Sequence, residues 1–131
     1  MTIELTKDRA LVLVGAQGSG KTRLAEKIAQ KIGAPAFIDA PVTYQKLLRL
    51  FYLSEPAVVV IDDCNSNNER AIIKELIAGV LRIENRGLRE SKTIHPYVII
   101  TTNDERWLKG DDRRCHVLPI AEARRLMGEP S

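Results

Sequence analysis

The sequence predicts a single α/β domain in three layers, with a central, mostly parallel sheet of five strands. Apolar runs that suit strands buried on both faces alternate along the chain with segments whose apolar residues recur at helical spacing. The chain has 131 residues, of which 44% are hydrophobic and 28% charged, as is typical of one globular domain. We therefore expect residues 1–131 to form one domain with a core of its own.

The first half of the chain predicts two strand–helix units. An apolar run over 10–15 ends at a glycine and is expected to be the first strand. The next segment, 21–32, has apolar residues at helical intervals, and Gly33 is a natural stop for that helix. A short second strand is expected over 36–39, followed by a second amphipathic helix over 44–53.

The second half continues the alternation and interrupts it once. A buried strand is expected over 58–62, a helix over 68–80, and two further strands over 97–102 and 116–120. The interruption lies over 81–95, where two short β-capable arms flank a glycine. We predict that these arms form a β-hairpin inserted before the fourth strand of the sheet.

A glycine-rich loop joins the first strand to the first helix, and it matches the pattern G-x-x-x-x-G-K-[ST] at every required position. The loop residues are Gly15, Ala16, Gln17, Gly18, Ser19, Gly20, Lys21 and Thr22. The glycines allow backbone N–H groups to turn inward around an anion, and the positive end of the helix dipole adds to the attraction. Lys21 is placed to reach the β- and γ-phosphates of ATP, and the Thr22 hydroxyl to bind Mg²⁺.

Polar residues at the ends of later strands complete a candidate ATPase site. The third strand delivers Asp62 and Asp63 to the carboxyl edge of the sheet, where open α/β sheets bind their ligands. Asp62 is expected to hold Mg²⁺, and Asp63 to orient or deprotonate the attacking water. Asn103, at the tip of the fourth strand, is expected to contact the γ-phosphate and that water. Arg113 and Arg114 are candidates for an arginine finger offered to the ATP of a neighbouring subunit.

Composition excludes several other classes of protein. No apolar run approaches the roughly 20 residues that span a bilayer, and the N-terminus lacks the pattern of a signal peptide, so we expect a cytoplasmic protein with no membrane partner. Cys64 and Cys115 are too few for a disulfide scaffold, and His95 and His116 lack partners at metal-ligand spacing. The net charge of +3 permits a nucleic-acid partner without requiring one.

The order of these motifs resembles that of the superfamily 3 helicases of small DNA viruses, phages and plasmids, a branch of the AAA+ ATPases. The resemblance covers about residues 10–120. Besides the glycine-rich loop, the segments that carry it are Asp62-Asp63, Ile73–Gly79 with Asn85–Gly87, Thr101–Asn103 and Asp112–Arg114. The aspartate pair is closer to this superfamily than the Asp-Glu usual in other AAA+ proteins. The resemblance implies a P-loop NTPase fold of AAA+ type.

The resemblance also implies an assembly and a ligand. Members of the superfamily form hexameric rings that bind ATP and Mg²⁺ at subunit interfaces and grip single-stranded DNA in a central channel. The inserted hairpin would present Arg86, Arg89 and Lys92 to that DNA, whereas a solvated β-ribbon is the other interpretation of the same charges. The short flanks predict a motor core without a lid or origin-binding domain. Such a core would act with another replication protein, in the host cytoplasm if the source is a virus.

Two other functions fit parts of the sequence. An AAA+ loader or adaptor would use ATP as an assembly switch on a partner replication protein, with little turnover. A small-molecule P-loop kinase would share the loop and the fold class, with Asp39 and Arg113 or Arg114 binding its substrate. The aspartate pair, the basic hairpin and the lack of a lid insertion argue against the kinase. Stimulation of hydrolysis by DNA would separate the motor from the loader.

Overall fold

Five parallel strands form the centre of the computed structural model, which describes residues 5–39, 41–53, 56–64, 70–79, 81–84, 91–103 and 115–128. Their order across the sheet is β2-β3-β6-β1-β7, and each neighbouring pair runs parallel. The strands are β1 (Ala10–Val14), β2 (Pro35–Asp39), β3 (Val58–Asp62), β6 (Tyr97–Thr102) and β7 (Cys115–Pro119). The expected five-stranded parallel sheet is confirmed.

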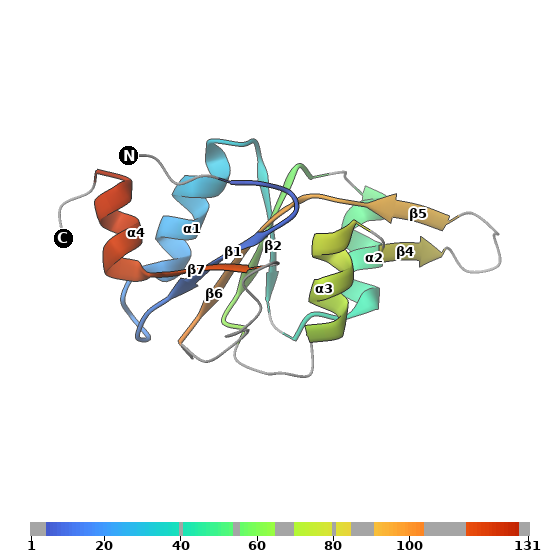
Figure 1. The fold of residues 1–131 in the computed structure, drawn as a ribbon. Coiled ribbons are helices and arrows are strands. Elements are labelled where there is room, and N and C mark those ends of the chain that lie inside the picture. The colour runs from blue at the N-terminus through green and yellow to red at the C-terminus, as the bar shows by residue number, and fades with distance from the viewer. Residues whose placement is uncertain are drawn as a thin grey trace.

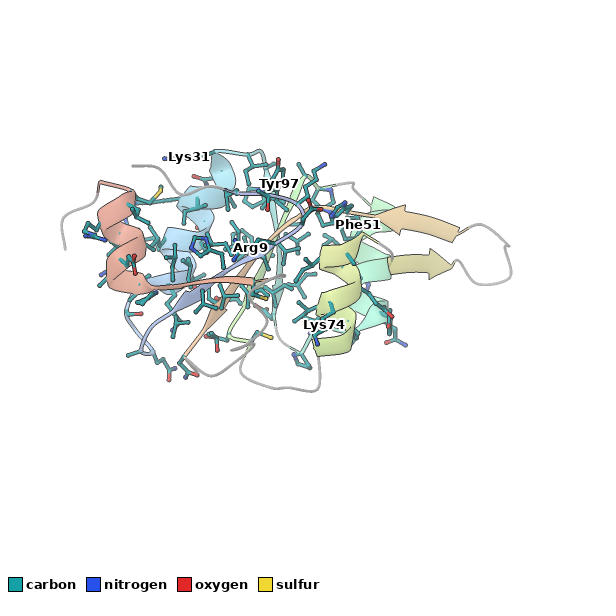
Figure 2. The ribbon with its side chains drawn as sticks, viewed as in Figure 1. Arg9, Lys31, Phe51, Lys74 and Tyr97 are labelled. Carbon is teal, nitrogen blue, oxygen red and sulfur yellow. The ribbon has the colours of Figure 1, made fainter. Side chains whose placement is uncertain are left out.

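Helices cover both faces of this sheet, as Figure 1 shows. They are α1 (Lys21–Gln30), α2 (Tyr44–Leu53), α3 (Arg70–Ala78) and α4 (Ile120–Leu126). Helices α1 and α4 share one apolar cluster with the sheet, while α2 and α3 share a second cluster with its other face. Figure 2 draws the side chains between the layers, among them the buried Phe51 of α2. The three-layer α/β architecture is therefore as predicted.

The sequence of each strand explains its place in the sheet. The apolar residues of β3, from Val58 to Ile61, have no exposed surface, because helices cover a central strand on both faces. The edge strand β2 is different, since Ile38 is buried while Phe37 is 44% exposed. Because all strands are parallel, β1, β3 and β6 end at the same edge of the sheet, where the predicted site residues follow them.

A two-stranded hairpin precedes β6, as the sequence predicts. Its arms, β4 (Leu81–Glu84) and β5 (Ser91–Ile94), pair antiparallel, with Leu81 opposite Ile94 and Glu84 opposite Ser91. In Figure 1 the hairpin projects beyond α2 and α3, at the opposite end of the molecule from α1 and α4. Arg86 and Arg89 lie outside the described residues. Lys92 pairs with Ile83 through the strand register.

The structure departs from the sequence prediction mainly at the C-terminal end. The fifth strand is Cys115–Pro119, and Ile120, expected as its last residue, instead begins α4, a helix that the sequence analysis did not predict. Helix α3 ends at Ala78, before the expected end at residue 80, because the φ of +72° at Gly79 ends the helical conformation; residues 68 and 69 lie outside the described residues. Among the helices that the structure describes, none has the length and apolar character that crossing a bilayer requires.

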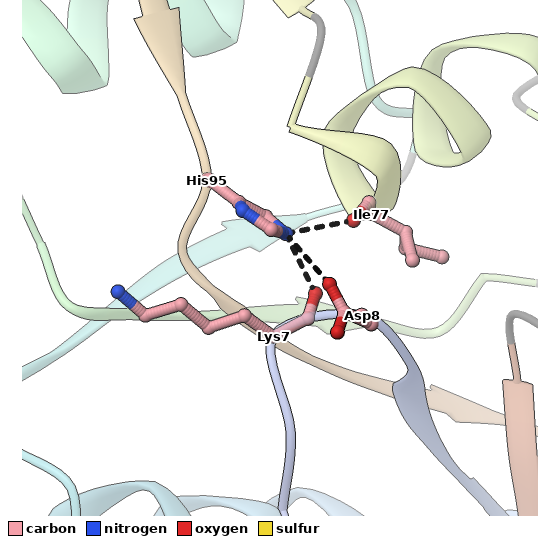
Figure 3. Close-up of polar contacts among 4 residues, drawn as sticks. All are labelled: Lys7, Asp8, Ile77 and His95. Atoms are coloured by element: carbon pink, nitrogen blue, oxygen red, sulfur yellow. Dashed lines mark hydrogen bonds and ion pairs between the residues drawn. The ribbon is translucent and has the colours of Figure 1, made fainter.

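His95, at the base of the hairpin, contacts the end of α3 and the segment before β1, as Figure 3 shows. Its Nε2 lies 3.0 Å from the carbonyl oxygen of Ile77 in α3, 3.0 Å from that of Lys7, and 3.8 Å from Asp8 Oδ1. Because carbonyl oxygens only accept hydrogen bonds, Nε2 carries the proton. An added Cβ at Gly79 would lie 2.7 Å from His95 Cγ, so the ring packs directly against the end of α3.

Candidate active site

The glycine-rich loop leaves β1 and leads directly into α1. Its first residue, Gly15, donates a backbone hydrogen bond to the carbonyl oxygen of Thr102 in β6, at 3.1 Å. Gly18 and Gly20 have φ values of +83° and +87°, a region that residues with a side chain rarely adopt. An added Cβ at Gly15 would lie 2.7 Å from Ile120 Cγ2, so this position also excludes a larger residue.

Lys21, the first residue of α1, turns back across the loop. It is only 6% exposed, and its Nζ donates a hydrogen bond to the carbonyl oxygen of Ala16 at 3.1 Å. The first turn of α1 contains no acidic residue, so the positive end of the helix dipole is not offset by its own side chains. The loop thus combines a helix N-terminus with a buried ammonium group, which together suit a phosphate group.

Ser19 gives an independent sign that the loop binds a polar group. Its Oγ is buried and has no hydrogen-bond partner within the part of the chain that the structure describes. Leaving a buried hydroxyl unpaired is costly, and such groups in native proteins are usually satisfied by a ligand or water. The unpaired hydroxyl and the obligatory glycines therefore fit a loop that closes around phosphate.

Asp62 is the centre of a hydrogen-bonded group at the end of β3. Its Oδ1 accepts hydrogen bonds from Thr22 Oγ1 in α1 and from Thr101 Oγ1 in β6, each at 2.6 Å. Because β6 lies between β1 and β3, Thr22 reaches over the end of β6 to meet the carboxylate. The structure therefore brings together the two residues expected to hold Mg²⁺, and their carboxylate and hydroxyl oxygens are ligand types that Mg²⁺ accepts.

Asp63 has an unusual backbone conformation. Its φ is +55°, and among the described residues it is the only non-glycine residue with a positive φ. Its N–H donates to Thr101 Oγ1 at 3.0 Å, and the next N–H, of Cys64, donates to the Thr101 carbonyl oxygen at 2.9 Å. These bonds to β6 hold a left-handed residue in place and leave the Asp63 side chain exposed.

The structure describes the positions of some of the remaining predicted residues and not of others. Asn103 is exposed and follows β6, so it lies at the sheet edge between the glycine-rich loop and the aspartate pair. Asp39 is opposite Asp62 in the register of β2 and β3, on the side of β3 away from the loop. Arg113 and Arg114 lie outside the described residues.

Sequence analysis missed two residues that belong to this site. Thr101 is fully buried, and its hydroxyl donates a hydrogen bond to Asp62 Oδ1 and accepts one from the Asp63 N–H. The sequence signal for Thr101 was a polar residue inside an apolar strand, because a buried hydroxyl needs hydrogen-bond partners. Arg124, from the unpredicted helix α4, donates a hydrogen bond to the carbonyl oxygen of Ser19. Nothing in the sequence pattern indicated Arg124. The described residues contain no cluster of His, Cys, Asp and Glu that could form a metal site of another kind.

Comparison with known proteins gives a family match for most of the chain. A protein-family model described as RNA helicase matches residues 11–104, more than half of the 131 residues. The matched segment begins in β1 and ends just after Asn103, so it contains the glycine-rich loop, the aspartate pair and the hairpin. Among curated proteins, no sequence matches this chain.

Two solved structures share the fold. The JCV helicase superposes with a TM-score of 0.56 at 14% identity, covering 88% of this chain and 36% of its own. The C-terminal region of NrS-1 superposes with a TM-score of 0.52 at 19% identity, covering 87% of this chain and 29% of its own. The chain therefore spans about a third of the length of these two chains. At such low identity, the likeness is one of fold.

Proposed function

We propose that this chain, which belongs to the RNA helicase family, is the Mg²⁺-dependent ATPase core of a superfamily 3 type of helicase. The observation that carries the proposal is the shared Asp62 carboxylate, which joins Thr22 of the loop helix to Thr101 of β6. This carboxylate lies beside a loop whose glycines, buried lysine and unpaired serine hydroxyl fit a triphosphate. A phosphate cradle and a metal-binding pair at one edge are the parts that phosphoryl transfer needs.

Each residue of the site has a role in this proposal. The N–H groups of the loop bind the phosphates, and Lys21 exchanges the Ala16 carbonyl for the β- and γ-phosphate oxygens. Thr22 and Asp62 hold Mg²⁺, which neutralises the charge that develops on the phosphates. Thr101 keeps the Asp62 carboxylate turned toward Thr22.

Asp63 and Asn103 act on the attacking water. The exposed Asp63 carboxylate accepts a proton from that water, and the Asn103 amide orients it against the γ-phosphate. Both residues follow neighbouring strands, β3 and β6, so they reach the same side of the site. The left-handed backbone of Asp63 supports this role, because strain of this kind is concentrated at functional positions.

Assembly and nucleic-acid binding belong to the same proposal. Arg113 or Arg114 supplies an arginine finger to the ATP of the next subunit in a hexameric ring. The hairpin presents Arg86, Arg89 and Lys92 to single-stranded DNA. Its projection from the body of the domain supports this part of the proposal, because a projecting ribbon is accessible to a strand in a channel (Figure 1). The family description names RNA, so RNA is tested beside DNA.

The test is steady-state hydrolysis of ATP with Mg²⁺ over a series of protein concentrations. Lys21→Ala should reduce turnover by about 100-fold or more, because it removes the cation that contacts the transferred phosphoryl group. Lys31→Ala is the matched control, since Lys31 lies just beyond the other end of α1; within the described residues its Nζ donates a hydrogen bond to the Met127 sulfur at 3.8 Å and to no other group. Equal turnover in Lys21→Ala and the parent would reject the ATPase site.

The same assay tests the nucleic-acid and ring parts. Single-stranded DNA should raise turnover, and specific activity should rise with protein concentration if the site is completed by a neighbour. Replacing Arg86, Arg89 and Lys92 with alanine should weaken DNA binding and flatten its salt dependence, because fewer counterions are released. An equal response to RNA would broaden the substrate, whereas ATP binding without stimulated turnover would favour a loader or adaptor that acts on a partner replication protein.

A further inference from the structure

Helix α4 lies along the glycine-rich loop and touches both of its ends. An added Cβ at Gly15 would lie 2.7 Å from Ile120 Cγ2, and an added Cβ at Gly20 would lie 2.6 Å from Arg124 Nη2. Ile120 and Arg124 are four residues apart and therefore lie on the same face of the helix. Ala123, just before Arg124, is fully buried in the cluster that α1 and α4 share. The helix thus supports the loop from its first glycine to its last.

Within the part of the chain that the structure describes, the partner of the Arg124 guanidinium group is the loop backbone and not an acidic side chain. The guanidinium donates a hydrogen bond to the Ser19 carbonyl oxygen. The pocket beside this contact has a volume of about 180 Å³; its other charged lining residues are Arg23 and Lys27, and no carboxylate lines it. Glu122, the acidic residue of α4, is 3.8 Å from Arg125 instead.

The peptide that Arg124 binds has its N–H on the opposite side. In a trans peptide the C=O and the following N–H point in opposite directions, so the Gly20 N–H points away from the Arg124 guanidinium. In loops of this pattern the N–H groups face the bound phosphate. A cation that donates a hydrogen bond to the Ser19 carbonyl oxygen therefore favours the peptide orientation in which the Gly20 N–H faces the anion.

We propose that Arg124 is a positioning residue for phosphate binding, which acts by holding the Ser19–Gly20 peptide with the Gly20 N–H directed at the anion. Arg124 does not itself touch the phosphate. A charge-assisted bond to the carbonyl also polarises the peptide, which makes its N–H a better donor. The proposal rests on the proposed function, because it concerns the same loop.

The experiment measures phosphate binding without hydrolysis. The affinity of the full chain for two probes is measured by isothermal titration calorimetry in the presence of Mg²⁺. The probes are ADP, which contains a nucleoside, and inorganic tripolyphosphate, which does not. Arg124→Gln should weaken both probes to the same degree, about fivefold to tenfold, as expected for loss of one charge-assisted hydrogen bond. Arg125→Gln removes the same charge from the next residue, whose side chain is 75% exposed, and should change neither affinity more than about twofold.

Three outcomes decide the proposal. Unchanged affinity of Arg124→Gln for both probes would overturn it, as would an equal loss in Arg125→Gln, which would indicate net charge alone. A loss confined to ADP would also overturn it, because Arg124 would then contact the nucleoside directly. If the parent itself bound neither probe, the proposed function would fail. If the parent bound the probes and Arg124→Gln bound them equally well, only the role of Arg124 would fail.

A second measurement separates positioning from a general loss of structure. In the ligand-free protein, the amide proton of Gly20 should shift upfield in Arg124→Gln, because its peptide is less polarised, and should be unaffected in Arg125→Gln. If Arg124→Gln fails to fold, the neutral variant Arg124→Met replaces it, with the same expected losses. Arg124→Lys keeps a positively charged donor and should retain affinity to within about threefold of the parent. An unchanged Gly20 amide shift in the folded neutral variant would reject the mechanism.

Discussion

Thr101 offers a quantitative test of the hydrogen-bonded group around Asp62. The substitution Thr101→Val keeps the shape of the side chain and removes only its hydroxyl. Asp62 Oδ1 then loses one of its two identified donors, at 2.6 Å, and the Asp63 N–H loses its acceptor at 3.0 Å. Because Thr101 is fully buried, water does not freely replace its hydroxyl beside the Asp62 carboxylate.

The expected cost follows from the charged bond. A hydrogen bond to an ionised group contributes about 1.5–3 kcal/mol, and the exposed position of Asp63 allows its N–H to be partly solvated, so we assign about 2 kcal/mol in total. For a domain of this size, a loss of about 2 kcal/mol lowers Tm by roughly 8 °C. ATP turnover should fall as well, because the Asp62 carboxylate is free to turn away from Thr22.

The assay is urea unfolding followed by circular dichroism, with Thr101→Ser as the control. Serine keeps the hydroxyl and loses one buried methyl group, so it should cost only about 1 kcal/mol and retain turnover. The reasoning would be refuted if Thr101→Val lay within about 0.5 kcal/mol of the parent. It would also fail if serine and valine were equally destabilising, since the methyl group and not the hydroxyl would then matter.

Three further substitutions test other parts of the molecule. Asp63→Asn should keep nucleotide affinity and reduce turnover by at least about 100-fold, because asparagine tolerates the φ of +55° but cannot accept the proton; a normal rate would place the base elsewhere. His95→Phe should lower the free energy of unfolding by about 1 kcal/mol, measured in urea, by removing the donor to Ile77. The hydrogen bond to Glu75 raises the pKa of Tyr44 in the folded protein above its unfolded value of 10.0. The stability that this hydrogen bond contributes is therefore complete below pH 10 and is lost as the pH rises through the pKa of Tyr44 in the folded protein. Tyr44→Phe should therefore remove part of the alkaline loss of stability in urea titrations between pH 8 and 11, and an unchanged profile would contradict the assignment.

The strands and the loop were predictable from sequence because their determinants are local. The apolar run of β3, with no exposed surface from Val58 to Ile61, predicted its strand to the residue. The glycine-rich loop was equally clear, since its positive φ angles at Gly18 and Gly20 require the residue type that the pattern specifies. The hairpin arms were predicted because they interrupt a regular alternation of strands and helices.

The features that were not predictable depend on contacts distant in sequence. Helix α4 has seven residues, too few for its own periodicity to signal a helix, and Ala123 and its apolar neighbours hold it in the cluster that it shares with the sheet and α1. The hydrogen bonds of Thr101 to Asp62 and Asp63 need β6 to lie beside β3, and strand order is not encoded in hydrophobic periodicity. His95 likewise gave no signal, because its partners are the backbone carbonyls of Lys7 and Ile77.

Strand β6 joins the hairpin to the candidate active site. It begins at Tyr97, two residues after His95, and ends at Thr102, so at about 3.3 Å per residue it spans about 17 Å. Its pairing with β1 on one side and β3 on the other holds it as a rigid element, with Thr101 bound to Asp62 at the far end. Contiguity alone does not establish coupling between two sites. His95→Phe supplies the test, because it loosens the base of the hairpin without touching Asp62: stimulation of turnover by single-stranded DNA should fall while the basal rate stays, and a proportional loss of both would show that the substitution acts on the site as a whole.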